Sequence, residues 1–365
     1  MSAPRRRWRL ALGLVGAVLA LVLAVAPFSR APRSLPRAGG AAPTPTTPAF
    51  PADAIPLRLA IHVKNLYNLQ LDNQTFSADG WYWLQWDQRL EDLIQSAQIA
   101  YDRLVEFDNQ IDLADASIEA ETTRPTINAD GSRQLMFRFS GHFYIDRLDL
   151  HNSPFDKVVL PLVLETRPEL FSASQQPVRL EPAKAQYRLV GDYGDVAGYE
   201  LRGATLKTGV NVYEGLGREK AQAYSQLGVR VTYGTDFLAA FLKWMLPLLI
   251  VMIVVLLAPS LEGSLGDIRL AIPSTALLTL VFLQQTYRAE LPATPYPTFL
   301  DQIYAYSYLV AVGLFLLFVW SSNTFEDTPE PEREAVRQRI NRVDAICQRL
   351  ALGGFLVWTL LAWFF

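Results

Sequence analysis

One apolar stretch of the chain carries polar side chains at a regular spacing. In the segment 266–295, Asp267, Thr275 and Gln285 interrupt a run that is long enough to cross a lipid bilayer. With three further residues they form a series separated by four, four, three, four and three positions: Asp267, Ala271, Thr275, Leu278, Phe282 and Gln285. On an α-helix this spacing places all six side chains on one face, which we call the stripe.

A stripe of this kind has two physical explanations in a membrane helix. Lipid cannot satisfy its polar groups, so the stripe must face protein, as in a packed bundle interior, or water, as in a pore. In a pore of identical subunits, Asp267 would form a ring of carboxylates that attracts cations and repels anions. Leu278 and Phe282 would form apolar rings that close the pore by dewetting. The alternatives are bundle-core packing for these two residues and a favourable interaction with the helix dipole for Asp267.

Two further residues of this segment bear on the geometry. Arg269 lies about 200° around the helix from Asp267, so we expect it to reach lipid headgroups or a neighbouring carboxylate. Pro273 removes one helical hydrogen bond and marks either a kink or a late start of the helix.

The composition of the 365-residue chain is that of a membrane protein. Half of the residues are hydrophobic and 19% are charged, with a mean hydropathy of +0.13. The net charge of −3 gives no reason to expect a nucleic-acid partner. The single cysteine, Cys347, excludes an intrachain disulfide, and the three histidines lack ligand spacing, so we expect no metal and no cofactor. No hydrolase elbow, phosphate loop or paired-histidine helix is found, so no enzyme is indicated.

The N-terminal half divides into three segments. Residues 1–26 join a basic cluster to an apolar run, and are either a cleaved signal peptide or an uncleaved N-terminal anchor. Residues 27–55 form a linker rich in Pro, Ala and Thr. Residues 56–235 contain many short alternating runs and predict an antiparallel β-sandwich, with a helix inserted at 90–106. The basic N-terminal flank predicts that this β domain is extracytoplasmic.

The C-terminal segment, 236–365, predicts a four-helix membrane domain. The spans are expected at about 237–259, 267–290, 299–320 and 346–365. The second half of the charged connector 321–345 has the pattern of a helix that continues into the last span. The chain is therefore expected to be a multi-pass protein of the cell (inner) membrane.

Several motifs resemble those of the pentameric ligand-gated ion channels, the superfamily of the Cys-loop receptors. Residues 149–157, DLHNSPFDK, resemble the family's Asp-Leu-x-x-x-Pro-Phe-Asp loop without its cysteines, as in prokaryotic members. Residues 86–90, WDQRL, are similar to the Trp-x-Asp-x-Arg-Leu signature with one residue fewer. Residues 291–296 and 300–302 resemble the loop after the pore helix of bacterial members, and Pro247 matches the proline of the first helix.

The resemblance implies roles for particular residues. The stripe residues match the family's pore-lining positions, in the same register that the periodicity gives. The family's loop would bring Pro154, Phe155 and Asp156 against the connector at 291–295, so that Leu291 and Pro292 take part in coupling the β domain to the pore. The family usually has an arginine twelve residues before the first-helix proline, where this chain has Thr235. That departure puts the coupling through Asp156 in doubt.

A ligand pocket is the least defined part of the resemblance. Trp81 and Trp83 lie on the strand that would form one side, and Tyr213 and Tyr224 lie in the hairpin expected at 206–226 on the other side. All four are also common core or interface aromatics. Without a full aromatic box, a quaternary-amine ligand is not supported.

These observations predict an extracytoplasmic β-sandwich followed by four membrane helices. The expected function is a homopentameric, cation-selective channel, opened when an unknown small ligand or protons bind the β domain. The expected partners are therefore further copies of the chain, the lipid bilayer, the ligand and permeant cations. The alternative is a non-conducting membrane sensor or binding module with the same fold, which the departure at Thr235 and the inserted helical segment favour.

Overall fold

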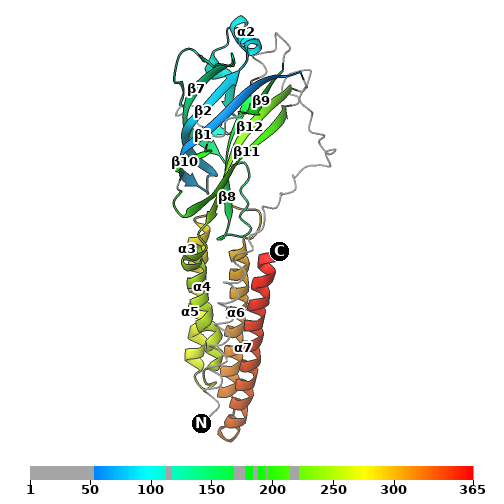
Figure 1. The fold of residues 1–365 in the computed structure, drawn as a ribbon. Helices are drawn as coiled ribbons and strands as arrows, with labels where there is room; N and C mark the ends of the chain where they lie inside the picture. The colour runs from blue at the N-terminus through cyan, green and yellow to red at the C-terminus, as the bar shows by residue number, and fades with distance from the viewer. Residues whose placement is uncertain are drawn as a thin grey trace. The chain divides into compact units, whose positions relative to one another are not determined.

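The computed structural model describes residues 53–111, 117–167, 177–183, 188–194, 196–213 and 222–364. These form a β-rich N-terminal part and a helical C-terminal part (Figure 1). Of the described residues, one compact unit contains 53–148 and 157–234, and the other contains 149–156 and 235–364. The loop 149–156 thus belongs to the helical unit although both its neighbours along the chain are β-strands. The expected signal or anchor and nearly all of the expected linker lie outside the described residues.

The larger sheet is built on three long antiparallel strands. It contains β1 (Ile55–Gln70), β2 (Thr75–Trp86), β4 (Gln110–Ile111), β5 (Ser117–Ala120), β6 (Thr126–Ile127), β7 (Arg133–Tyr144), β9 (Val178–Pro182) and β10 (Val190–Tyr193). β2 lies between β1 and β7 and pairs antiparallel with both. β9 and β10 pair with β1 in parallel, so the sheet is mixed rather than purely antiparallel as expected.

The second sheet has four strands in the order β11 (Tyr199–Tyr213), β12 (Gln222–Thr235), β8 (Lys157–Thr166) and β3 (Val105–Phe107). Buried residues of both sheets form a single hydrophobic core. Phe107 of β3 packs against Phe139 and Phe143 of β7, with ring centroids 4.9 and 5.2 Å apart. The alternation of buried and partly exposed residues along β1 and β7 is the one that the sequence pattern predicts.

The helix inserted between β2 and β3 is shorter than the expected 90–106. α2 (Gln88–Ser96) begins after Asp87, whose carboxylate accepts a hydrogen bond from the Leu90 amide at 3.1 Å. Gln98 adopts a left-handed conformation with φ of 52°, which ends the helix. A 3₁₀ turn (Tyr101–Arg103) follows, and Val105 lies in β3. The prediction was wrong beyond residue 96, because its apolar spacing is shared between a helix and a buried strand.

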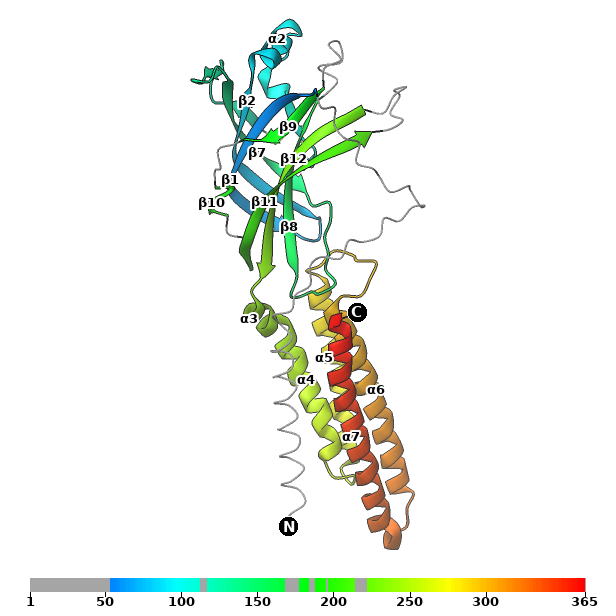
Figure 2. The same ribbon diagram turned by 45° about the vertical axis from the view of Figure 1, so that its right-hand side comes forward.

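Four helical segments follow the second sheet (Figure 2). The first joins α3 (Phe237–Ala240), a π-helical turn (Phe241–Met245), α4 (Leu246–Leu257) and a 3₁₀ turn (Ala258–Ser260). The others are α5 (Gly266–Arg288), α6 (Phe299–Glu326) and α7 (Arg333–Phe364), the last preceded by a 3₁₀ turn (Glu330–Glu332). All four segments are long and apolar enough to cross a membrane, which fits a transmembrane protein.

The prolines occupy two different helical settings. Pro247 is the second residue of α4 and directly follows the π-helical turn. Pro273 lies inside α5, which is continuous from Gly266, so the late-start alternative is wrong. The charged connector is helical from Arg333 into the last span, as predicted.

Candidate functional site

The six stripe residues lie on the exposed face of α5. All are exposed in the single chain, including Leu278 at 59% and Phe282 at 63%. The buried residues of α5 are Arg269, Pro273, Ala276, Leu280 and Tyr287. At 3.6 residues per turn, these five fall within an arc of about 60° roughly opposite the stripe. α5 therefore packs against α4 and α6 with its other side and leaves the stripe uncovered by them.

The loop 149–156 completes the N-terminus of α6. The first amides of a helix have no partner within it. The amide of Phe299 donates to the carbonyl of His151 at 2.7 Å, and the amide of Leu300 donates to that of Ser153 at 3.3 Å. Thr298 and Asp301 satisfy the neighbouring positions as a capping box. The loop thus provides hydrogen-bond acceptors that the helix itself lacks.

Tyr296 joins the same loop from the connector between α5 and α6. Its ring stacks on that of His151, with centroids 3.7 Å apart and planes inclined by 6°. The amide of Leu150 donates to the Tyr296 hydroxyl at 3.1 Å. On the other side, the His151 Nδ1 lies 2.7 Å from Asp149 Oδ1.

Phe155 anchors the end of the loop among three helices. It is buried, and its ring centroid lies 4.8 Å from Phe237 of α3, 6.4 Å from Phe299 of α6 and 6.1 Å from Trp363 of α7. Phe299 and Trp363 also meet edge to face at 5.2 Å. One side chain of the loop therefore contacts the ends of three helices. We refer to Phe155, Phe237, Phe299 and Trp363 as the aromatic cluster.

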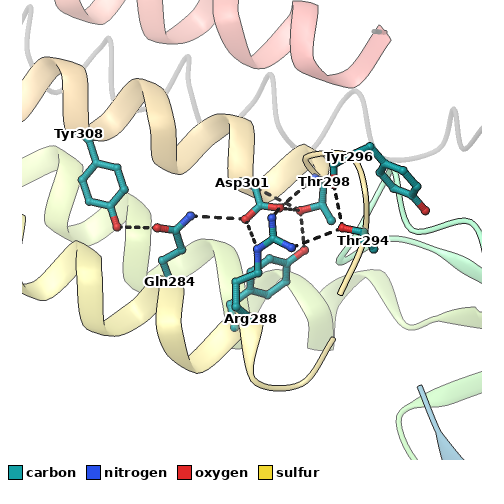
Figure 3. A network of polar contacts seen from close by, with 8 residues as sticks. Gln284, Arg288, Thr294, Tyr296, Thr298, Asp301 and Tyr308 are labelled. Carbon is teal, nitrogen blue, oxygen red and sulfur yellow. Dashed lines mark hydrogen bonds and ion pairs between the residues drawn. The ribbon is translucent and has the colours of Figure 1, made fainter. Parts of the chain in front are cut away.

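A polar network fixes the end of α5 to the start of α6 (Figure 3). Arg288 Nη2 and Asp301 Oδ2 are 2.7 Å apart, and Asp301 Oδ2 also accepts from the hydroxyl of Thr298 at 2.7 Å. Tyr287 of α5 shares a hydrogen bond of 2.9 Å with Thr298. Further down the helices, the Tyr308 hydroxyl donates to Gln284 at 2.8 Å. These contacts join α5 directly to α6, next to the connector 289–298 that links the two helices.

The expected coupling residues are placed as follows. Pro154, Phe155 and Asp156 are buried, and the Ser153–Pro154 peptide is cis. Pro292 is buried and Leu291 is partly buried against the helical core. The loop contacts described above fall a few residues later, on Tyr296 of the connector and on Phe299 and Leu300 at the start of α6. The sequence did not predict the contact between His151 and Tyr296. The Thr298-x-x-Asp301 capping signature, which is visible in the sequence, could have located the start of α6 but not its partners in the loop.

Asp156 is buried, and no cationic side chain among the described residues forms an ion pair with its carboxyl group. Burial raises its pKa well above the ordinary value, and the nearby Asp149 adds to this effect. Hydrogen bonds from Ser153 and Asn152 favour the charged form and offset the rise only in part. Where the family resemblance implies an arginine, the amide of Thr235 donates instead to the Asp156 backbone carbonyl at 3.2 Å. The polar connection at this position therefore ends on the backbone carbonyl of Asp156 and not on its carboxyl group.

The expected ligand residues lie on different sheets. Trp81 and Trp83 are partly exposed on β2 of the larger sheet, and Tyr224 lies on β12 of the other. Trp81 stacks on His62 at 5.9 Å, with Lys64 Nζ 5.4 Å from its ring. The side chain of Tyr213 lies outside the described residues.

In the described part of the chain, no group of three or more His, Cys, Asp or Glu side chains is arranged to hold a metal. No protein-family model and no curated protein matches the chain.

Replacing Phe155 by Ala should lower the free energy of unfolding by about 3–5 kcal/mol, because it removes the ring shared by three helix ends. Phe155→Leu keeps part of the packing and should cost about 1–2 kcal/mol. Thermal and denaturant unfolding of the full chain in detergent micelles measures both. Tyr193→Ala, at a side chain that is 70% exposed, is the matched control. Equal stability of Phe155→Ala and this control would contradict the anchoring role.

Asp156 should make the stability of the chain depend on pH. Because the pKa is raised in the folded protein, the neutral carboxyl is favoured, and its contribution is complete below the unfolded pKa of about 3.9. That contribution is lost as pH rises through the folded pKa. We expect the midpoint of thermal unfolding of Asp156→Asn, relative to the natural chain, to increase as pH rises from about 4. A difference that stays constant between pH 4 and 8 would refute this.

Proposed function

We propose that the chain is a subunit of a homopentameric, cation-selective channel of the pentameric ligand-gated family. The observation that carries the proposal is the exposed stripe of α5. If α5 crosses a bilayer, Asp267, Thr275 and Gln285 cannot face lipid at acceptable cost. The chain's own helices pack on the opposite side, so further copies and an enclosed column of water are the natural cover for the stripe. Five copies around one axis provide both.

The proposed pore has a charged end and an apolar middle. Asp267 would supply one carboxylate per subunit at the cytoplasmic end, and the ring would favour cations by attraction and exclude anions by repulsion. Leu278 and Phe282 would form successive apolar rings, where a narrow closed pore loses its water. In this arrangement the polar side chains of the stripe face water, which satisfies them, and they do not face lipid.

The proposed sensor is the β part, as an extracytoplasmic sandwich. Its two sheets share one hydrophobic core, which supports that arrangement. The chain passes from this unit into the helical unit and back around residues 149–156, and enters it again at Thr235. Loop 149–156 completes the α6 terminus and inserts Phe155 into the aromatic cluster. Ligand or proton binding that shifts the sheets would reach the helix ends through these connections, and the states would differ in ligand affinity.

A non-conducting sensor with the same fold is the second candidate. The buried Asp156, with Thr235 in place of the family's arginine, favours it, because the ion pair that the family resemblance implies between the loop and the start of the first helix cannot form. Current recordings from purified protein in planar bilayers, over a series of pH values and a panel of small ligands, discriminate the two. A correctly assembled protein that passes no current under any of these conditions would exclude the channel.

Asp267→Asn should reduce the permeability ratio of cation to anion by roughly five- to tenfold, because it removes the proposed carboxylate ring. The measurement is the reversal potential in a salt gradient. Glu262→Gln, an exposed acid in the connector before α5, is the matched control and should leave the potential unchanged. An unaltered potential in Asp267→Asn would place the selectivity elsewhere.

Leu278→Ser should favour the open state, because a polar ring keeps the narrow part wet. Single-channel recordings should show a higher open probability without added ligand. Leu277→Ser, beside it but off the stripe, should change open probability much less. Closed behaviour like that of the natural chain would show that the constriction lies at another level.

A further inference from the structure

A buried ion pair lies behind the charged end of the stripe. Arg269 of α5 is 1% exposed and Asp344 of α7 is fully buried, and Arg269 Nη2 lies 2.6 Å from Asp344 Oδ2. The alternative left open by the sequence is thus resolved in favour of a neighbouring carboxylate, 75 positions along the chain. A charge buried this deeply without a counter-charge costs several kcal/mol, so each partner depends on the other.

Helix α6 completes the surroundings of Arg269. Its guanidinium lies 4.3 Å from the ring centroid of Phe318, and its Nη1 lies 3.4 Å from the hydroxyl of Ser321. The arginine therefore connects α5 with both α6 and α7 at the end that carries Asp267. Ser321 and Phe318 bring no formal charge, so among these contacts only Asp344 balances the arginine.

The position of this pair matters for the electrostatics of the stripe. Arg269 follows Asp267 by two residues, a rise of about 3 Å along the helix axis, and points to the opposite side. In a pentamer, five such cations would stand directly behind five carboxylates. Uncompensated, their field would oppose the attraction that the carboxylates exert on cations. Paired with Asp344, each arginine contributes a dipole rather than a net charge.

We infer that Asp344, on the helix farthest along the chain, determines charge selectivity by neutralising Arg269, so that Asp267 alone sets the net charge at this end of the pore. The inference rests on the proposed function. Asp344 acts through Arg269 and does not line the stripe, so it is a positioning and charge-balancing residue.

The test is the reversal potential of three variants in a salt gradient. Asp344→Asn leaves the arginine uncompensated and should lower the cation-to-anion permeability ratio roughly two- to tenfold. Arg269→Gln removes the opposing cation and should leave that ratio equal to or above that of the natural chain. The double variant Arg269→Gln with Asp344→Asn should restore it. If the ion pair had a purely structural role, both single variants would change the cation-to-anion permeability ratio in the same direction.

Each outcome has a definite meaning. If Asp344→Asn does not assemble, Arg269→Gln and the double variant still decide, because a fall in cation preference in both would overturn the inference. If the natural chain is cation-selective and an assembled Asp344→Asn keeps its ratio, the inference fails while the channel stands. If the natural chain passes no current in any condition, the proposed function itself fails.

Discussion

The first amide groups of α6 have no partner within their own helix, and the carbonyl groups of loop 149–156 supply one. These hydrogen bonds hold the loop to the helical unit. They join a loop bordered by two strands to the start of α6. Because the acceptors are backbone atoms, the contact is insensitive to the side chains at 151 and 153. The side chain that fixes the position of the loop is Phe155, whose ring packs against residues at three helix ends.

The electrostatics of this region follow from one missing cation. Asp156 is buried beside Asp149 with no arginine at position 235, so its neutral form is favoured. A carboxyl group that holds its proton by burial changes charge at a higher pH than an exposed one. The loop thus contains a group whose ionisation would place a charge inside a packed junction. Such a group gives the protons of the proposed function a specific place to act.

Much of this arrangement could be predicted from local sequence. The stripe and the four spans follow from helical periodicity and hydropathy, and α7 was expected to begin in the charged connector. The features that the sequence did not predict depend on the backbone conformation of single residues or on contacts between residues far apart in the chain. Helix α2 ends at Ser96 because Gln98, two residues later, has a left-handed φ that no periodicity reveals. The stacking of His151 on Tyr296 joins residues 145 positions apart, and no spacing rule identifies such a pair. Helical periodicity predicts that Arg269 points away from the stripe, but it does not identify Asp344 as its partner.

Two of the contacts that hold helix α7 lie near opposite ends of its apolar part. Trp363 belongs to the aromatic cluster, and Asp344 holds Arg269. Trp363 follows Asp344 by nineteen positions, which corresponds to about 28 Å of helix, close to the roughly 30 Å of a hydrocarbon core. The two attachments are thus separated by one bilayer thickness. If α7 crosses a bilayer, a thinner or thicker membrane would change how much apolar surface is covered next to each contact, so the cost of hydrophobic mismatch would fall where α7 meets α5 and α6.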